Sequence, residues 1–185
     1  MKLNLGCGFD RRDGFVNVDN QPLCEPDTLA DLEKFPWPFE ESSAEEIVLS
    51  HVLEHLGGTT EIYFKIIQEL YRVAAPGGLI TITVPHPRHD EFLMDPTHVR
   101  PITADQFYLF SKKQTRAWRG EGVANTPLAD ILDVDFDVAG IQSLPDDVWL
   151  AKLQSGEMTT EELAHMAMYQ VNIIKEVTVE LRAVK

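Results

Sequence analysis

The sequence predicts an α/β protein: a doubly wound, mostly parallel sheet with an antiparallel pair of strands at its C-terminal end. Three observations favour this fold class. Short apolar runs alternate with segments of helical spacing, glycines or carboxylates follow several of these runs, and residues 171–184 alternate as a long final strand does. At 185 residues, the chain (1–185) is expected to form one domain.

The N-terminal part of the chain contains four short apolar runs that predict strands. They are residues 2–6, 15–19, 28–32 and 46–50. Between the first two runs, residues 9–14 are too few and too polar to form a full helix. Residues 35–39 contain two prolines, which exclude a helix or a central strand and predict a rigid aromatic loop.

The periodicity is stronger after residue 58. A helix is expected to begin near Glu61, because Thr59 or Thr60 can cap it and apolar residues then recur on one face. The turn Pro76-Gly77-Gly78 ends this helix, and the β-branched run 79–84 predicts a fifth strand. The remaining predictions are helices over 103–112, 145–154 and 159–169, strands over 136–141 and 171–184, and a mobile loop over 112–130.

The composition restricts the partners. Sixteen basic and thirty acidic residues give a net charge of −14, which repels phosphate backbones and argues against DNA or RNA as a substrate. The basic cluster within 112–119 is interpreted as a solvated helix face. No run of 18 apolar residues occurs, so no membrane partner is expected. The oligomeric state stays open.

The location is predicted from the N-terminus and the cysteines. The chain opens on a strand and a glycine turn and shows no secretory signal pattern. Cys7 and Cys24 are its only cysteines, and Cys7 lies inside the glycine turn, where pairing is disfavoured. A reduced, cytoplasmic protein is therefore the simpler interpretation.

A glycine turn and a carboxylate together predict a nucleoside site. Gly6 and Gly8 follow the first strand and allow a ligand to lie against bare backbone. Asp19 ends the second strand, where its carboxylate can accept two hydrogen bonds from a ribose diol. Asp31 and Ser50 also follow strand ends, and the carboxyl ends of parallel strands meet at one edge of a sheet. A nicotinamide-binding fold is disfavoured, because its third glycine would stand at position 11, which is an arginine.

Four segments, in this order, resemble the class I S-adenosylmethionine-dependent methyltransferases. They are residues 3–8, 18–19, 31–39 and 69–78. Because the first of these strands lies at the start of the sequence, the chain resembles a small, N-terminally truncated variant of that family. The resemblance implies a Rossmann-like methyltransferase fold, an enzyme that uses S-adenosylmethionine, and a small-molecule or sugar-type acceptor. It also implies that residues 1–84 bind the cofactor and residues 85–170 form the acceptor side.

The family's cofactor contacts can be carried over to matching positions. The resemblance places Gly6, Cys7 and Gly8 along the methionine part of the cofactor, with Ser50 and His51 under it, and counts Leu5 among the cofactor-binding residues. It places Asp19 on the ribose hydroxyls, Asn20 beside the adenine, and Asp31 and Leu32 on the adenine edge. The chain departs from the family pattern at Asn4, where an acidic residue is usual, and at Asp10, where a third glycine is usual.

One motif is typical of zinc proteases. Residues 51–55 match the pattern His-x-x-Glu-His, which needs a helical scaffold and further ligands. Here the motif directly follows a strand at the predicted cofactor edge, so we assign no metal to it. We expect His51 and Glu54 to line the crevice, and His55 to cap or pack.

The segment after the fifth strand is the candidate for chemistry. Methyl transfer to a hydroxyl or amine requires alignment and removal of a proton, for which an imidazole is suited. His98 is therefore the predicted base, with Asp95 three residues earlier to orient it. Two alternatives stay open for this segment: a polar surface loop, or a metal site from His86, His89, Asp90, Asp95 and His98. Two rival functions stay open: the protein binds S-adenosylmethionine without catalysis, or it is another enzyme that consumes this cofactor.

Overall fold

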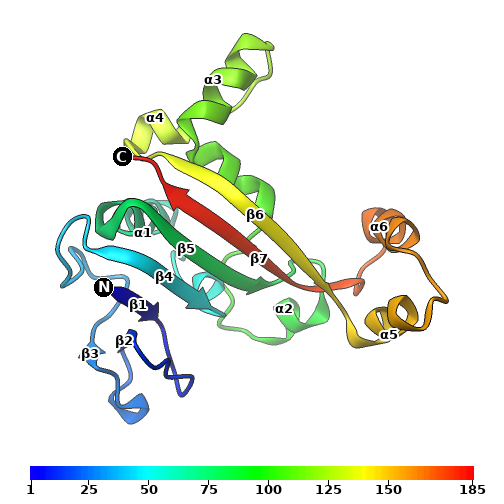
Figure 1. Cartoon of the computed structure of the whole chain (residues 1–185), viewed down its shortest axis with the longest axis horizontal. Helices are drawn as coiled ribbons and strands as arrows, with labels where there is room; N and C mark the ends of the chain where they lie inside the picture. The colour runs from blue at the N-terminus through cyan, green and yellow to red at the C-terminus, as the bar shows by residue number, and fades with distance from the viewer.

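The computed structural model describes all 185 residues, and its centre is a seven-stranded sheet of order β3-β2-β1-β4-β5-β7-β6 (Figure 1). The strands are β1 (Lys2–Leu5), β2 (Val16–Asp19), β3 (Thr28–Leu29), β4 (Ala44–Ser50), β5 (Ala74–Pro85), β6 (Phe136–Pro145) and β7 (Ile174–Ala183). The first five pair in parallel, and β7 runs antiparallel to both β5 and β6. This confirms the predicted mostly parallel, Rossmann-like sheet and its antiparallel C-terminal pair.

The predicted helices after Thr59 and over 145–154 and 159–169 are confirmed, whereas the predicted helix over 103–112 is a 3₁₀ helix over 104–110. The α-helices are α1 (Thr60–Val73), α2 (Asp90–Met94), α3 (Lys112–Gly120), α4 (Leu128–Leu132), α5 (Asp147–Ser155) and α6 (Thr160–Tyr169), with 3₁₀ turns η1 (Pro22–Cys24), η2 (Leu53–His55) and η3 (Ala104–Phe110). The predicted cap of α1 is confirmed, because the Thr59 side chain accepts from the N–H of Ile62. Thr159 and Glu162 form a full capping box at α6. None of these helices is long and apolar enough to cross a membrane.

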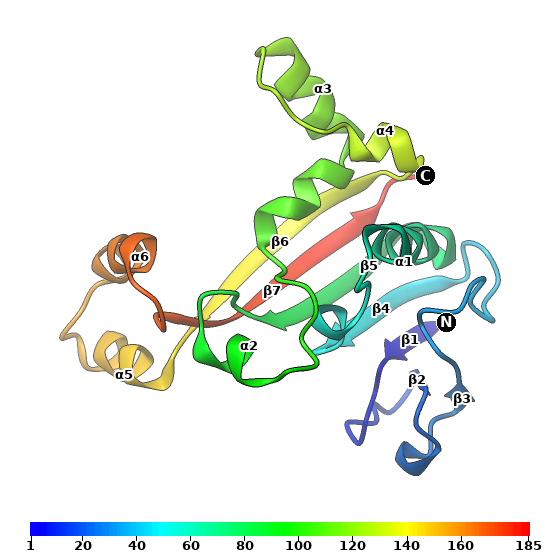
Figure 2. The same cartoon turned by 180° about the vertical axis from the view of Figure 1, so that it is seen from behind.

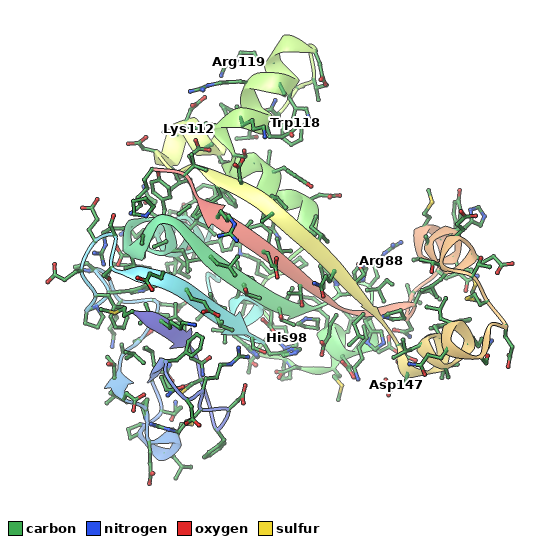
Figure 3. The ribbon with its side chains drawn as sticks, viewed as in Figure 1. Arg88, His98, Lys112, Trp118, Arg119 and Asp147 are labelled. Atoms are coloured by element: carbon green, nitrogen blue, oxygen red, sulfur yellow. The ribbon has the colours of Figure 1, made fainter.

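The prediction of a loop over 112–130 is wrong. Residues 112–120 form α3 and residues 128–132 form α4. The Ser111 side chain accepts from the N–H of Gln114 and so caps α3, a signal that the dense basic charge of this segment concealed. Figure 3 shows Lys112, Trp118 and Arg119 on this helix, which leans away from the sheet, in keeping with a solvated basic face.

Helices cover mainly one face of the sheet. In Figure 1 the strands lie in front of α1, and in Figure 2 α1 and η3 lie in front of the strands. Along β5, Ile80, Ile82 and Val84 are buried on the helix side, whereas Thr81 and Thr83 alternate with them and are only half-buried. No α-helix connects β1 to β2 or β2 to β3, so this edge lacks the elements that would cover the second face.

Side chains of β1 and β2 hold the loop between these strands, which contains no helix. Asn4 is buried, and its amide donates to the backbone carbonyl of Asp10 and to Oδ1 of Asn17. Asn17 Oδ1 also accepts from the N–H of Arg12. The residues that depart from the family pattern, Asn4 and Asp10, are thus partners in a network that closes the glycine turn.

Candidate functional site

A cavity of about 220 Å³ lies where β1, β2 and β4 end. Five predicted cofactor residues line it: Gly6, Asp19, Asn20, Leu32 and His51. Its other lining residues are Ala30, Val52, His55 and Leu56, for which the sequence offered no motif beyond proximity to strand ends. The cavity therefore lies at the carboxyl edge of the sheet, where the sequence predicts the nucleoside site.

The other predicted contacts lie outside this cavity wall. Leu5 and Cys7 are buried in the strand and turn beneath it, and Ser50 is half-buried at the end of β4. Asp31 lines a shallower neighbouring hollow that shares Asn20 and Ala30 with the cavity. The Asp31 carboxylate accepts from the N–H of Glu33 and lies 3.5 Å from Nζ of Lys34.

The Asp19 carboxylate joins the glycine turn to the second strand. Its Oδ2 accepts from the N–H of Gly8 at 2.8 Å, and its Oδ1 accepts from the N–H of Gln21 at 2.8 Å. Each oxygen retains a lone pair toward the cavity, because a carboxylate offers about four acceptor positions. The carboxylate is thus held in place before any ligand arrives.

Gly6 is required by both its conformation and its surroundings. Its φ is +66°, and a Cβ there would lie 2.5 Å from Cγ2 of Val52. Gly8 also has a positive φ, +50°, but a Cβ there would meet no atom within 4 Å. A side chain at position 6 would therefore collide with Val52, whereas position 8 has space for one.

We expect Gly6→Ala to be more harmful than Gly8→Ala. Both changes cost about 1–2 kcal/mol for a left-handed alanine, and only Gly6→Ala adds overpacking of about 1–3 kcal/mol against Val52. Urea unfolding of the two variants measures the difference, and calorimetry with S-adenosylhomocysteine measures the effect on the cavity. Equal losses of stability in the two variants would contradict the predicted role of the Val52 contact.

The loop after β4 and the segment 95–100 are joined by backbone hydrogen bonds. The carbonyl of Glu54 accepts from the N–H groups of Val99 and Arg100. The Arg100 guanidinium donates to the carbonyl of Gly57 and lies 4.3 Å from the Tyr63 ring centroid. These contacts bring the ring of His98 to 4.6 Å from that of His55, and Figure 3 shows His98 near the ends of β4 and β5.

The structure arranges the histidine motif differently from the prediction. His51 lines the cavity as predicted, but Glu54 is fully buried and does not line it, so that part of the prediction is wrong. His55, expected only to cap or pack, is part of the cavity wall. Contact with the Glu54 carboxylate, reinforced by Glu176, raises the pKa of His51 despite its partial burial.

His98 is oriented by a backbone group. Its Nδ1 lies 2.8 Å from the carbonyl oxygen of Phe92, which can only accept, so Nδ1 carries the proton and Nε2 keeps a lone pair. Asp95 lies 3.9 Å from Nε2 of His98, beyond hydrogen-bond distance. Its carboxylate instead accepts from the N–H and the hydroxyl of Thr97, which lowers the pKa of Asp95.

The other histidines of this segment make separate contacts. His86 Nδ1 accepts from the N–H of Arg88, and burial lowers the pKa of this imidazole. His89 caps α2 through Nδ1, and its Nε2 lies 3.3 Å from Asp146. The structure therefore does not assemble His86, His89 and His98 into one site.

Comparisons with known proteins agree with the fold. Residues 4–82 match the family model described as a methyltransferase domain. A solved S-adenosylmethionine-dependent methyltransferase from Archaeoglobus fulgidus aligns with 16% identity and a TM-score of 0.63, over 97% of this chain and 84% of that one. A methyltransferase of the same description from Mesorhizobium loti aligns with 16% identity and a TM-score of 0.51, over 97% and 89%.

A third structure shows that this fold also serves other reactions. The [4+2]-cyclase SpnF aligns with 14% identity and a TM-score of 0.55, over 98% of this chain and 74% of that one. At these identities the structural likeness concerns the fold. No curated protein sequence matches the chain.

The family match and the fold agree with each other. They confirm the predicted resemblance to the class I S-adenosylmethionine-dependent methyltransferases. The match to a methyltransferase domain covers residues 4–82, and the chain shares the fold of solved S-adenosylmethionine-dependent methyltransferases.

Proposed function

We propose that this enzyme transfers the methyl group of S-adenosylmethionine to a small-molecule or sugar-type acceptor. The observation that carries this proposal is the cavity at the ends of β1, β2 and β4, where Asp19 is prepositioned beside the turn at Gly6. The net charge of −14 supports a small acceptor over a nucleic acid.

In this proposal the cofactor extends along the edge of the sheet. Asp19 accepts from the ribose hydroxyls, Asn20 and Leu32 contact the adenine, and Asp31 reaches the adenine amine from the neighbouring hollow. The turn Leu5-Gly6-Cys7-Gly8 follows the methionine part, above Ser50 and His51. These roles agree with the five predicted residues that line the cavity.

Residues 85–170 form the acceptor side in this proposal. Methyl transfer forms a bond from the acceptor oxygen or nitrogen to the methyl carbon and breaks the carbon–sulfur bond of the sulfonium. The products are the methylated acceptor, S-adenosylhomocysteine and a proton. Removal of that proton depends on Nε2 of His98. This nitrogen keeps its lone pair because Nδ1 carries the ring proton and donates it to the carbonyl of Phe92. Asp95 supports this segment through Thr97.

Calorimetry with S-adenosylhomocysteine tests cofactor binding. We expect the wild-type protein to bind it and Asp19→Ala to bind about tenfold to a hundredfold more weakly, because hydrogen bonds to a charged acceptor contribute about 1.5–3 kcal/mol. Asp105→Ala is the control, because this aspartate lies in η3, outside the cavity. A wild-type protein that shows no binding at high ligand concentration would end the proposal.

Analysis of products separates the rival functions. Incubation of S-adenosylmethionine with candidate sugars and metabolites should yield S-adenosylhomocysteine together with a methylated acceptor. Methylthioadenosine would indicate breakdown of the cofactor instead. Binding without either product across the acceptor screen would favour a non-catalytic role.

A further inference from the structure

Glu54, His55 and His98 form a cluster of metal-ligand type beside the proposed cofactor cavity. One ligand atom from each of the three side chains lies within 4.8 Å of the others. No other group of three or more histidine, cysteine, aspartate or glutamate side chains in the chain comes together in this way. Two imidazoles and one carboxylate are a donor set that suits zinc and related ions.

Glu54 has the surroundings of a carboxylate that needs a cation. The residue is 0% exposed, and neither carboxylate oxygen has a hydrogen-bond partner in the protein. Nδ1 of His51 lies 3.6 Å from Oε1, beyond hydrogen-bond distance. Burial of an ionised carboxylate is costly unless the charge is paired or coordinates a metal. A bound cation would remove this cost.

Both histidines of the cluster have the hydrogen bonds expected of metal ligands. The Thr97 hydroxyl donates to Asp95, so its oxygen accepts from Nδ1 of His55 at 2.9 Å. Nδ1 of His98 donates to the carbonyl of Phe92. In each ring Nδ1 carries the proton and Nε2 keeps its lone pair. Histidines that bind metals usually donate their other N–H to a carbonyl or a carboxylate-linked group in this way.

We propose that Glu54, His55 and His98 bind one divalent transition-metal ion of the zinc type. A tetrahedral zinc ion places its ligand atoms about 3.3 Å apart, so the three side chains must approach one another when the ion binds. The backbone bonds from Val99 and Arg100 to Glu54 hold the two loops close enough for this small movement. Asp95 then acts through Thr97, as a support for the His55 ligand.

The ion would also complete the acceptor site. Zinc with three protein ligands keeps a fourth position for water or a substrate oxygen, and His55 belongs to the cavity wall. This role rests on the proposed function: the ion binds the acceptor hydroxyl and lowers its pKa. The hydroxyl proton then leaves to solvent, and the oxygen attacks the methyl carbon as the carbon–sulfur bond breaks. His98 therefore assists deprotonation as a ligand of the ion.

Titration of the chelator-treated full chain with Zn²⁺ tests the inference. We expect one ion per chain by calorimetry, a Zn²⁺-dependent rise in Tm, and visible absorption typical of a tetrahedral site with Co²⁺. Glu54→Gln and His98→Ala should each weaken Zn²⁺ binding more than about tenfold, since even loss of a group that only hydrogen-bonds to a metal ligand costs about 10–100-fold. The matched control is His165→Ala, which removes an exposed histidine on α6 and should leave binding unchanged.

The outcomes separate this inference from the proposed function. Absence of saturable Zn²⁺ binding, or equal binding by His98→Ala and wild type, overturns the metal site. If Glu54→Gln fails to fold, as judged by circular dichroism, His98→Ala alone decides. S-adenosylhomocysteine binding is measured in the same chelator-treated sample. Its failure with Zn²⁺ binding intact overturns only the proposed function, and the reverse result overturns only the metal site.

Discussion

His98→Ala is expected to lower turnover about 10²–10⁴-fold, the span usual for loss of a group on which proton removal depends. The affinity for S-adenosylhomocysteine should hardly change, because His98 is not among the residues that line the cavity. Steady-state kinetics with an acceptor found by the screen, combined with calorimetry, measures both quantities. A selective loss of turnover is the signature of a group that acts on the acceptor side.

His86→Ala is the matched control for this variant. It removes a second histidine of the same segment, which is held by the N–H of Arg88 and lies outside the cluster of Glu54, His55 and His98. Its turnover should stay near that of the wild type. Wild-type turnover in His98→Ala, or an equal loss in His86→Ala, would remove His98 from the proposed mechanism.

Glu69→Ala should destabilise the fold by about 1.5–3 kcal/mol, the usual contribution of hydrogen bonds to a charged group, because Glu69 is buried and Arg72 is only partly exposed. Glu69 accepts from Nε and Nη2 of Arg72 at 2.7 Å each, and from the N–H of Trp37 at 2.6 Å. The same guanidinium donates to the carbonyls of Trp37 and Phe39. The pair thus anchors the aromatic loop that the two prolines predict.

The ion pair also gives stability a defined pH dependence. Burial raises the pKa of Glu69, but the hydrogen bonds from Arg72 and Trp37 outweigh it, and the net pKa lies below the usual 4.5. A folded-state pKa that is lowered stabilises the protein above pH 4.5, and the contribution is lost as the pH falls through the folded-state value.

Urea unfolding at neutral and acidic pH measures both effects. Glu69→Ala should lose most at neutral pH and approach the wild type as the pH falls. Glu45→Ala is the control, because this glutamate is exposed on β4 and makes no ion pair, so its effect should stay within about 0.5 kcal/mol. A loss below about 1 kcal/mol in Glu69→Ala would show that the pair is not a major anchor of the loop.

The loop connects stability to the site. Nε1 of Trp37 donates to the carbonyl of Leu32, and Leu32 lines the cavity. The aromatic loop was predicted from its prolines, but its contact with Glu69 was not, because the two residues are 32 positions apart in the chain. Local composition predicts that the loop is rigid, but it cannot predict that Glu69 holds the loop in place.

The sequence by itself determined the features that depend on neighbouring residues. Alternation in 79–84 and helical spacing after Thr59 were interpreted correctly because strands, helices and caps involve residues two to four positions apart. The site edge followed for the same reason: Gly6 and Asp19 end successive parallel strands, and such ends meet.

Only the tertiary structure decided which side chains complete the site. His55 and Thr97 are 42 positions apart, and they meet because the Glu54 carbonyl accepts from Val99 and Arg100. The periodicity of a sequence cannot predict such a pairing of two loops, because the pairing depends on backbone hydrogen bonds, which any residue type can form. Glu54 is also fully buried, and its carboxylate has no hydrogen-bond partner. The sequence could place the histidines near the cofactor edge, but only the folded chain brings His98 to the glutamate and histidine of the motif.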